Sequence, residues 1–590
     1  MSGRERRSQG WQRYPPLAGA LAATLLALLV LPSALNVPQS SPTQTLEFAP
    51  VPPDEDAPQP PEGGNTASLG LGSSQTAPGD ALGGGLGTAV ELPPTVPEGF
   101  GERPVTKRCV GDPPRQTEDP MAPPCVAYFE GDNFGATYPG VEQDEIRILF
   151  YMDGAGTSAS SRGVEQRERD RYYDLSEPAS DDEHVWLRTL RVWQRYFNER
   201  YQTYGRGARF FVYFTQGEGS ATVETRRADA IENHDHVRPF AVLNFAFHSG
   251  DPYTQEMASR GVMVFGGGLM QPAAFFRQHP GQIWAFLPSM ERWADLYTTH
   301  VCRRVVSHPV SFSGNAGENG QPRRYGLIRT HDDSHPELLA LARAIEDRLH
   351  ACGVEFAAES TFPQAGFFSQ PDTTGYSLEG MARFQEAGVT TVLWAGGLET
   401  NYSKAAGRLN YHPEWIVAGD SFLESGMNAS ANDPTVWDRA WVITPVEMQP
   451  PPAEKACTRA YTESDPDGRA DGEMWGCNWY VPIRQLFTGI QVAGPRLTPQ
   501  AVDQGFHAIP ATASTDPLVA ACSYEPNDYT CVKDGIAMWW DPNAEDTGCY
   551  RIPEAGRRYL SGQWPQRPVD ADRSPDDPCN HYENFAPIFG

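Results

Sequence analysis

The chain has 590 residues, which is enough for two or three domains with buried cores. Its formal net charge is −28 at pH 7. This charge argues against a polyanionic partner, because nucleic-acid binding needs a basic surface, so we expect an acidic surface and no nucleic-acid partner.

The N-terminal 37 residues have the pattern of an export signal. Arg4, Arg6 and Arg7 precede an Ala- and Leu-rich apolar run at 17–31. The length of this run leaves open whether it is a cleaved signal sequence or a membrane anchor. Residues 38–104 are rich in Pro, Gly, Ser and Thr with almost no aromatic side chain, so we interpret them as a disordered stalk. The sequence predicts an extracytoplasmic protein, secreted or anchored to the outer face of the cytoplasmic membrane.

Ten cysteines lie beyond the export segment, and none forms a Cys-x-x-Cys motif. In an exported protein this favours disulfides over a metal site. Proximity along the chain suggests five local pairs, each cysteine with its next neighbour, although sequence alone does not fix the connectivity. In chain order they are Cys109, Cys125, Cys302, Cys352, Cys457, Cys477, Cys522, Cys531, Cys549 and Cys579.

From residue 141 the chain alternates between strand-like and helix-like segments. Residues 145–151 and 209–215 are predicted strands, and between them Trp186, Leu190, Trp193 and Phe197 share one helix face. A helix is predicted at 222–233. Residues 240–247 form an apolar run that contains one polar residue, Asn244, and such a run is typical of a parallel strand buried on both faces. A short helix, a second strand ending in three glycines, and an apolar strand at 282–288 follow. This order predicts a parallel sheet with right-handed crossovers.

A Gly- and Asn-rich loop at 311–323 precedes a second set of alternating elements. A strand at 324–330 and a helix at 335–352 begin it. The alternation continues through 354–361, 376–387, 389–395, 398–409, 415–419 and 441–444. After residue 445 the pattern weakens, then returns with helices at 481–492 and 499–508 and a short strand at 535–540. These segments predict a second α/β lobe and a chain that crosses between lobes more than once.

The sequence resembles the type 1 periplasmic binding proteins, and within them the leucine/branched-chain amino-acid-binding group of ABC transporter substrate-binding proteins. The matching segments are the entry at 140–148, FAVLNFAFHSG, GVMVFGGG, RYGLIRTHDDSHPELLALARAIEDRLHACGVEF, FQEAGVTTVLWAG and VPIRQLFTGIQVAGPRLTPQAVDQGF, within 140–550. The resemblance implies two doubly wound α/β lobes joined by three crossover strands, with ligand held in the cleft. Mapped here, lobe one is 126–290 and 446–510, and lobe two is 291–445 and 511–590.

Ligands of open α/β sheets bind outside the carboxyl ends of the strands, so residues that follow strands are the candidates. After 240–247, the Ser249 hydroxyl and nearby N–H groups would receive a ligand carboxylate, unless Ser249 or Asp251 only caps the next helix. The glycine turn allows close approach of backbone to ligand, or simply a positive φ. His331 and Asp332 would face a ligand ammonium from lobe two, unless this segment only caps a helix. The predicted contacts are Asp153, His248, Ser249, Gly266, Gly267, Gly268, His331, Asp332, Gly396 and Asp420.

Two other kinds of site are less well supported by the pattern. The segment 419–422, Gly-Asp-Ser-Phe, resembles the nucleophile block of GDS-type lipases, in which a serine attacks an ester. That family needs a late Asp-x-x-His, and the nearest candidates, Asp577 and His581, are one residue too far apart. His234 and His236 could be a metal pair, but a solvated loop is the better interpretation, because no third ligand is evident.

The sequence therefore predicts a solute-binding protein without enzymatic activity or cofactor. It would capture a small polar, amino-acid-like ligand, and the resemblance implies that it delivers this ligand to an ABC permease. The alternative is a membrane-anchored extracellular sensor or interaction protein on the same fold, and an ester hydrolase is a remote third possibility.

Overall fold

The computed structural model describes residues 110–582 except for 113, 127, 153–171, 180–182, 184, 216–221, 247–251, 268–270, 332–335, 364–372, 396–399, 420–422, 439, 467–470 and 513–517. The predicted export segment and stalk lie outside the described residues. Among the helices within them, none is both long and apolar enough to cross a membrane.

The first lobe is built on a six-stranded sheet in the order β2-β3-β1-β4-β5-β6. Five of the strands, β3, β1, β4, β5 and β6, run parallel to one another, and only the short edge strand β2 is antiparallel. The strands are β1 (Glu145–Met152), β2 (Tyr172–Asp174), β3 (Gly207–Phe214), β4 (Ala241–Phe245), β5 (Met263–Phe265) and β6 (Ile283–Trp284). β4 is buried at every position, which confirms the interpretation of its apolar run.

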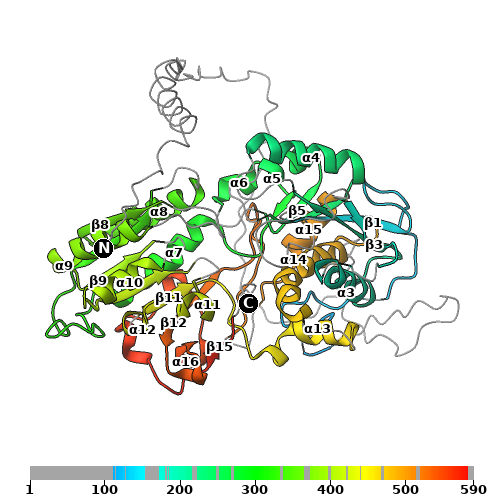
Figure 1. Ribbon diagram of the computed structural model, residues 1–590. Coiled ribbons are helices and arrows are strands. Elements are labelled where there is room, and N and C mark those ends of the chain that lie inside the picture. Colours follow the sequence, from blue (N-terminus) through cyan, green and yellow to red (C-terminus); the bar gives the residue numbers. More distant parts are fainter. Residues whose placement is uncertain are drawn as a thin grey trace, which may run out of the picture. The chain divides into compact units, whose positions relative to one another are not determined.

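Helices cover both faces of this sheet. On one face lie α3 (Val185–Arg200), α13 (Ala456–Ser464), α14 (Asp471–Ala493) and α15 (Pro499–Ala508), which share a core with alternate residues of β1 such as Ile148 and Phe150. On the other face lie α4 (Val223–Val237) and α5 (Pro252–Ser259), which pack against the intervening Leu149 and Tyr151. Figure 1 shows these two helix groups on opposite sides of β1 and β5. α6 (Ala273–Arg277) follows β5.

The second lobe contains a nine-stranded sheet that is parallel at one side and antiparallel at the other. The parallel strands are β7 (Tyr325–Thr330), β8 (Phe356–Phe362), β9 (Thr391–Trp394), β10 (Glu414–Ala418) and β11 (Ala440–Thr444). The antiparallel extension consists of β12 (Asp534–Asp541), β13 (Cys549–Arg551), β14 (Tyr559–Leu560) and β15 (Cys579–Asn580).

This sheet is also covered on both faces. α7 (Met290–His300), its π-helical continuation Val301–Val305 and α8 (Pro336–Ala351) pack on one face with Leu327 and Ile416. α9 (Thr374–Glu386), α10 (Asn401–Arg408), α11 (Gly426–Ser430) and α12 (Pro434–Trp437) belong to the opposite face, with Ile328 and Trp415. A one-turn helix, α16 (Pro553–Gly556), follows β13. The predicted fold class, two doubly wound α/β lobes, is confirmed.

Three connections join the lobes: the first is 285–289, the second 445–455 and the third 509–533. The first and third are hydrogen-bonded to each other, because Ala285 N–H donates to Tyr529 O and Cys531 N–H donates to Ala285 O, both at 3.0 Å. Arg558 holds the second by donating to Pro445 O at 2.7 Å and Val446 O at 2.9 Å.

Four of the predicted disulfides are present: Cys302–Cys352, Cys457–Cys477, Cys522–Cys531 and Cys549–Cys579. Cys125 is also disulfide-bonded. Its predicted partner, Cys109, lies outside the described residues. Each of the four confirmed pairs joins neighbours in cysteine order, so the disulfide-stapled character expected from the sequence is confirmed.

Several predicted bounds differ from the structure. His234 and His236 belong to the last turn of α4, not to a loop. The apolar segment 282–288 contributes only the two residues of β6 to the sheet. Ala520, Tyr524 and Val532 pack in the core of the first lobe, although the division expected from the resemblance assigns 511–590 to the second.

Candidate functional site

The parallel strands of the first lobe end at one edge of its sheet. Met152 of β1 lies in register with Phe214 of β3 and with Phe245 of β4, and Leu243 of β4 lies beside Phe265, the last residue of β5. Because ligands of open α/β sheets bind outside the carboxyl ends of the strands, this edge forms the first part of the candidate site.

Most of the predicted ligand contacts follow such strand ends and lie outside the described residues. These are Asp153, His248, Ser249, Gly268, Asp332, Gly396 and Asp420. The strands that lead to them end where the sequence indicated: β1 at Met152, β7 at Thr330 and β10 at Ala418. Contact of these side chains with a ligand stays a prediction. The structure describes Gly266, Gly267 and His331.

The Gly266 turn closes directly over the end of β4. Gly266 is exposed, with a φ of +80°, and a Cβ atom there would lie 3.0 Å from Asn244 O and 3.8 Å from Pro482 Cβ. Gly267 is buried. The positive φ and the close approach both require glycine, so the tight-turn interpretation of Gly266 is confirmed. The backbone here is also free of any side chain of its own, as close approach to a ligand requires.

Four aromatic side chains lie beneath this edge, and we call them the edge aromatic cluster: Trp186, Phe214, Phe245 and Trp479. Trp186 packs 6.1 Å from Phe214 and 5.9 Å from Trp479, and Phe245 packs 6.1 Å from Trp479, measured between ring centroids. Their exposed fractions lie between 2% and 9%. The sequence assigned Trp186 to a helix core and did not single out the others, although two of them are the final residues of apolar strands.

A buried ion pair lies where α14 meets the connections. Asp119 Oδ2 accepts a hydrogen bond from Arg484 Nη1 at 2.7 Å, and the two side chains are 3% and 5% exposed. The Arg484 guanidinium also lies 5.1 Å from the ring centroid of Phe286, in the first connection, and 5.9 Å from that of Tyr480. Arg484 therefore ties together α14, the N-terminal segment and the first connection.

Glu447, in the second connection, adds a carboxyl group to this ion pair. Burial raises the pKa of Glu447, and the positive charge of Arg484 only partly opposes that effect. Among the described residues, Glu447 Oε1 and Arg484 Nη2 are buried atoms with no hydrogen-bond partner. We call Asp119, Glu447 and Arg484 the hinge cluster. Its members are far apart in the sequence, and no sequence motif marks them.

In the second lobe, Gly419 directly follows the last residue of β10. Its N–H donates to Ile443 O at 2.9 Å, and its carbonyl accepts from Trp293 Nε1 at 2.6 Å. A Cβ at Gly419 would approach within 2.2 Å of Glu424 Oε1. Close packing thus explains this glycine of the Gly-Asp-Ser-Phe segment without any nucleophile.

His331 is exposed just after β7. Its N–H donates to Phe362 O at 3.0 Å, and its ring centroid lies 6.0 Å from that of Tyr376 in α9. The imidazole is therefore beside an exposed aromatic side chain of its own lobe. Contact of His331 with a ligand stays a prediction.

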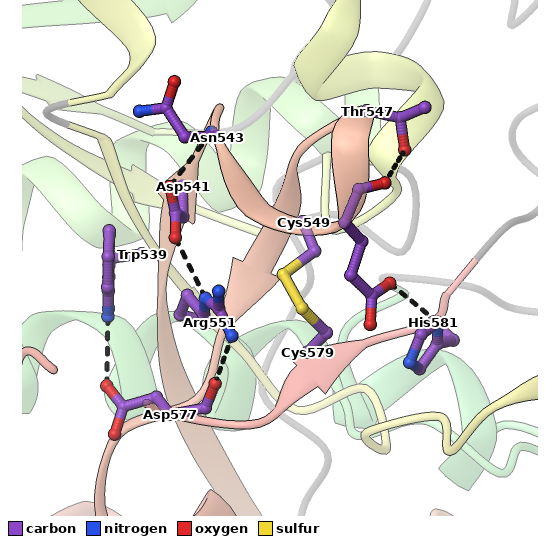
Figure 2. The surroundings of a disulfide bond; sticks show 10 residues. Trp539, Asp541, Asn543, Thr547, Cys549, Arg551, Asp577, Cys579 and His581 are labelled. Atoms are coloured by element: carbon purple, nitrogen blue, oxygen red, sulfur yellow. Dashed lines mark hydrogen bonds and ion pairs between the residues drawn. A yellow bond between two sulfur atoms is a disulfide. The ribbon is translucent and has the colours of Figure 1, made fainter. Parts of the chain in front are cut away.

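The terminal pair of the hydrolase alternative is not assembled. Asp577 Oδ2 accepts hydrogen bonds from Trp539 Nε1 at 3.2 Å and from the Ser574 N–H at 2.9 Å. His581 Nδ1 instead faces Glu545 Oε2 at 3.7 Å, and Figure 2 shows the two groups directed to separate partners. Ser421 lies outside the described residues.

The histidines of α4 are not arranged as a metal pair. His234 Nδ1 lies 3.0 Å from Asp235 Oδ1, whereas the His236 ring stacks on Tyr172 with centroids 4.1 Å apart. Across the part of the chain that the structure describes, no group of three or more His, Cys, Asp or Glu residues is placed to hold a metal ion.

No family model and no curated protein sequence match the chain. Solved structures do match. A substrate-binding protein of an ABC transporter from Aeropyrum pernix is 10% identical with a TM-score of 0.47, over 71% of this chain and 96% of that one. A solute-binding protein from Rhodopseudomonas palustris in complex with 4-hydroxybenzoate is 11% identical with a TM-score of 0.47, over 72% and 98%.

A leucine-, isoleucine-, valine-, threonine- and alanine-binding protein from Brucella ovis, in its closed conformation, is 12% identical with a TM-score of 0.45, over 74% of this chain and 100% of that one. The three structures named here are described as substrate-binding, solute-binding and amino-acid-binding proteins.

Proposed function

We propose that the chain is an extracytoplasmic solute-binding protein that captures a small polar, amino-acid-like ligand and delivers it to an ABC permease. One observation carries the proposal: in both lobes, parallel strands end directly before the predicted contacts, and three connections join the lobes. The four disulfides support an extracytoplasmic location, because such bonds persist in oxidising compartments.

The predicted contacts in the two lobes would bind different groups of the ligand. Backbone N–H groups and the Ser249 hydroxyl after β4 would donate hydrogen bonds to the ligand carboxylate, and Asp332 after β7 would pair with its ammonium. The Gly266 turn would let backbone approach the ligand closely. Such a site needs only hydrogen bonds, charge pairing and exclusion of water, so the proposed role is binding without catalysis.

A thermal-shift screen of the purified full-length protein tests this function. The panel contains amino acids, amides, short peptides and polyols, with aromatic carboxylates added because of the edge aromatic cluster. For the ligand that binds, we expect Ser249→Ala and Asp332→Asn each to weaken affinity about tenfold or more, because each removes a hydrogen bond to a charged group. Ser259→Ala and Asp347→Asn, at exposed helix positions, serve as controls. No shift with any compound would refute the proposal.

Measuring ligand uptake by cells distinguishes a transport protein from a sensor. A strain that lacks the protein should lose import of the identified ligand, and the wild-type gene should restore it. Binding without any change in uptake would instead favour the extracellular sensor on the same fold.

A further inference from the structure

A pocket of about 330 Å³ lies where α6, α7, α8 and the third connection meet, and Arg277, Arg292 and Arg348 are among its lining residues. Arg348 belongs to the last turn of α8. The helix rise places it about 18 Å along α8 from Pro336, next to the predicted ligand contacts after β7. Arg348 therefore lies at the end of α8 away from those contacts.

The three arginines come from three different helices, whose positions Figure 1 shows. Arg348 Nη1 donates to Ala344 O, one turn earlier in α8, at 3.3 Å. Within the described part of the chain, none of the three guanidinium groups forms an ion pair with a carboxylate. A chain with a net charge of −28 thus gathers around one pocket three arginines without ion-pair partners among its described residues.

The acidic residues of the same pocket are mostly engaged elsewhere. Glu291 Oε2 accepts a hydrogen bond from the Ala273 N–H at 2.9 Å. Asp528 Oδ2 pairs with Lys533 Nζ at 2.6 Å, and its other oxygen accepts from Thr530. Asp295 is the remaining carboxylate in the lining. The three arginines face three carboxylates in the lining, and Lys533, paired with Asp528, leaves a local excess of one positive charge.

Two buried aromatic side chains line the pocket. Phe276 is 1% exposed and Tyr529 is 4% exposed, and both line the pocket. Water-excluding walls of this kind strengthen the interaction between a guanidinium group and an anion. Arginine presents paired donors that match the oxygens of a phosphate or a carboxylate.

We propose that this pocket binds a small multivalent oxyanion, carrying phosphoryl or several carboxylate groups. Arg277 contacts it from the first lobe, and Arg292 and Arg348 contact it from the second. An anion held by arginines of both lobes stabilises the lobe arrangement in which these arginines are close together. It would therefore influence how the lobes are placed, without contacting the transported ligand. This inference does not depend on the proposed function.

Calorimetric titration of the purified full-length protein tests the site. Inorganic phosphate and pyrophosphate form the phosphoryl arm, and succinate and citrate the carboxylate arm, each up to about 10 mM, which detects millimolar dissociation constants. We expect saturable binding in at least one arm, weaker at higher salt. Arg277→Gln, Arg292→Gln and Arg348→Gln should each reduce affinity about tenfold or more.

Arg343→Gln is the matched control, because Arg343 is exposed on the same helix as Arg348 and does not line the pocket. Its affinity should equal that of the wild type. Circular dichroism selects the variants that fold, and because the arginines lie on separate helices, any one folded variant suffices. No saturable binding in either arm would overturn the proposal. The proposal would also be overturned if the folded pocket variants and R343Q weakened binding to the same extent.

Discussion

At Gly266 a single residue combines an unusual backbone conformation with a close contact. Its φ of +80° lies in the left-handed region, and a Cβ would meet Asn244 O at 3.0 Å. Gly317 has a φ of +79° but nothing within 4 Å of its Cβ position. Comparing substitutions at these two glycines therefore separates the free-energy cost of the left-handed backbone conformation from that of the contact with Asn244.

We expect Gly317→Ala to lower the free energy of unfolding by about 1 kcal/mol, because a left-handed L-residue is strained by roughly that amount. Gly266→Ala should cost about 2–3 kcal/mol, since the contact with Asn244 adds to the same strain. Denaturant unfolding of both variants measures the difference. Equal losses would mean that the turn moves away from β4 without cost.

Glu447 makes stability depend on pH in a defined direction. Its pKa is raised by burial, so the folded protein holds the proton more tightly than the unfolded chain. The stability that protonation gives is fully present below the ordinary pKa of glutamate and is lost as the pH rises through the raised pKa. Glu447→Gln should therefore be more stable than the wild type at pH 8 and equal to it below about pH 4.

Thermal unfolding of both proteins across this pH range checks the sign. Glu454→Gln, an exposed position in the same connection, is the control and should show no such crossover. A Glu447→Gln variant that is less stable at pH 8 would show that the carboxylate is needed by Arg484 in addition to Asp119.

At the scale of elements, the N-terminal segment 110–126 is anchored to helices of the first lobe. Gln116 Nε2 donates to Arg200 O at 2.8 Å, and Pro124 O accepts from Gln491 Nε2 at 2.9 Å. The Asp119–Arg484 ion pair joins these contacts across 365 positions of sequence. The segment that follows the predicted stalk is thus part of the folded lobe.

Asp119→Ala would leave the buried Arg484 charge without its closest carboxylate. We expect a loss of about 3–5 kcal/mol in the free energy of unfolding, the usual cost of breaking a buried ion pair. Asp119→Leu combined with Arg484→Met should recover most of this loss, because apolar replacement of the whole pair is often neutral. Denaturant unfolding checks both values, and a single-variant loss below about 1 kcal/mol would contradict the expectation.

The elements that the sequence predicted well are those with strong local periodicity. The buried face of α3 and the apolar run of β4 follow directly from residue spacing. α7 was not predicted: it is short and begins soon after an apolar segment, and Ser289, although at its N-cap, makes no side-chain capping bond. The antiparallel pairing of β12 with β11 was also missed, because a strand's partner depends on contacts distant in sequence.

The candidate site divides in the same way. Gly266 and His331 directly follow β5 and β7, as the sequence predicted, since a turn after a buried strand is a local signal. The hinge cluster and the edge aromatic cluster bring together side chains from separate parts of the chain. Arg484 lies in a predicted helix with an apolar pattern, and no residue near it in the sequence indicated that it would lie beside Asp119 and Glu447.

For the molecule as a whole, the disulfides close loops of very different length. Cys302–Cys352 joins positions 50 apart and links the end of α7 to the end of α8, whereas Cys522–Cys531 spans 9 within the third connection. Because a crosslink restricts the unfolded chain more when its loop is longer, the two bonds should contribute unequally.

Replacing Cys302 and Cys352 with serine should lower the free energy of unfolding by about 4 kcal/mol, and the same change at Cys522 and Cys531 by about 2.6 kcal/mol, by the loop-entropy relation. Denaturant unfolding under oxidising conditions measures both. The opposite order would show that native-state contacts outweigh loop length.

The pairing of the first and third connections restricts how the lobes can move. Val532 N–H donates to Phe286 O at 3.0 Å, beside the two bonds between Ala285 and its neighbours in the third connection. Sliding one strand past the other would break all three bonds, whereas bending both together breaks none. For a solute-binding protein of the proposed kind, opening and closing should therefore proceed as rotation about a two-stranded ribbon, and not as translation of one lobe across the other.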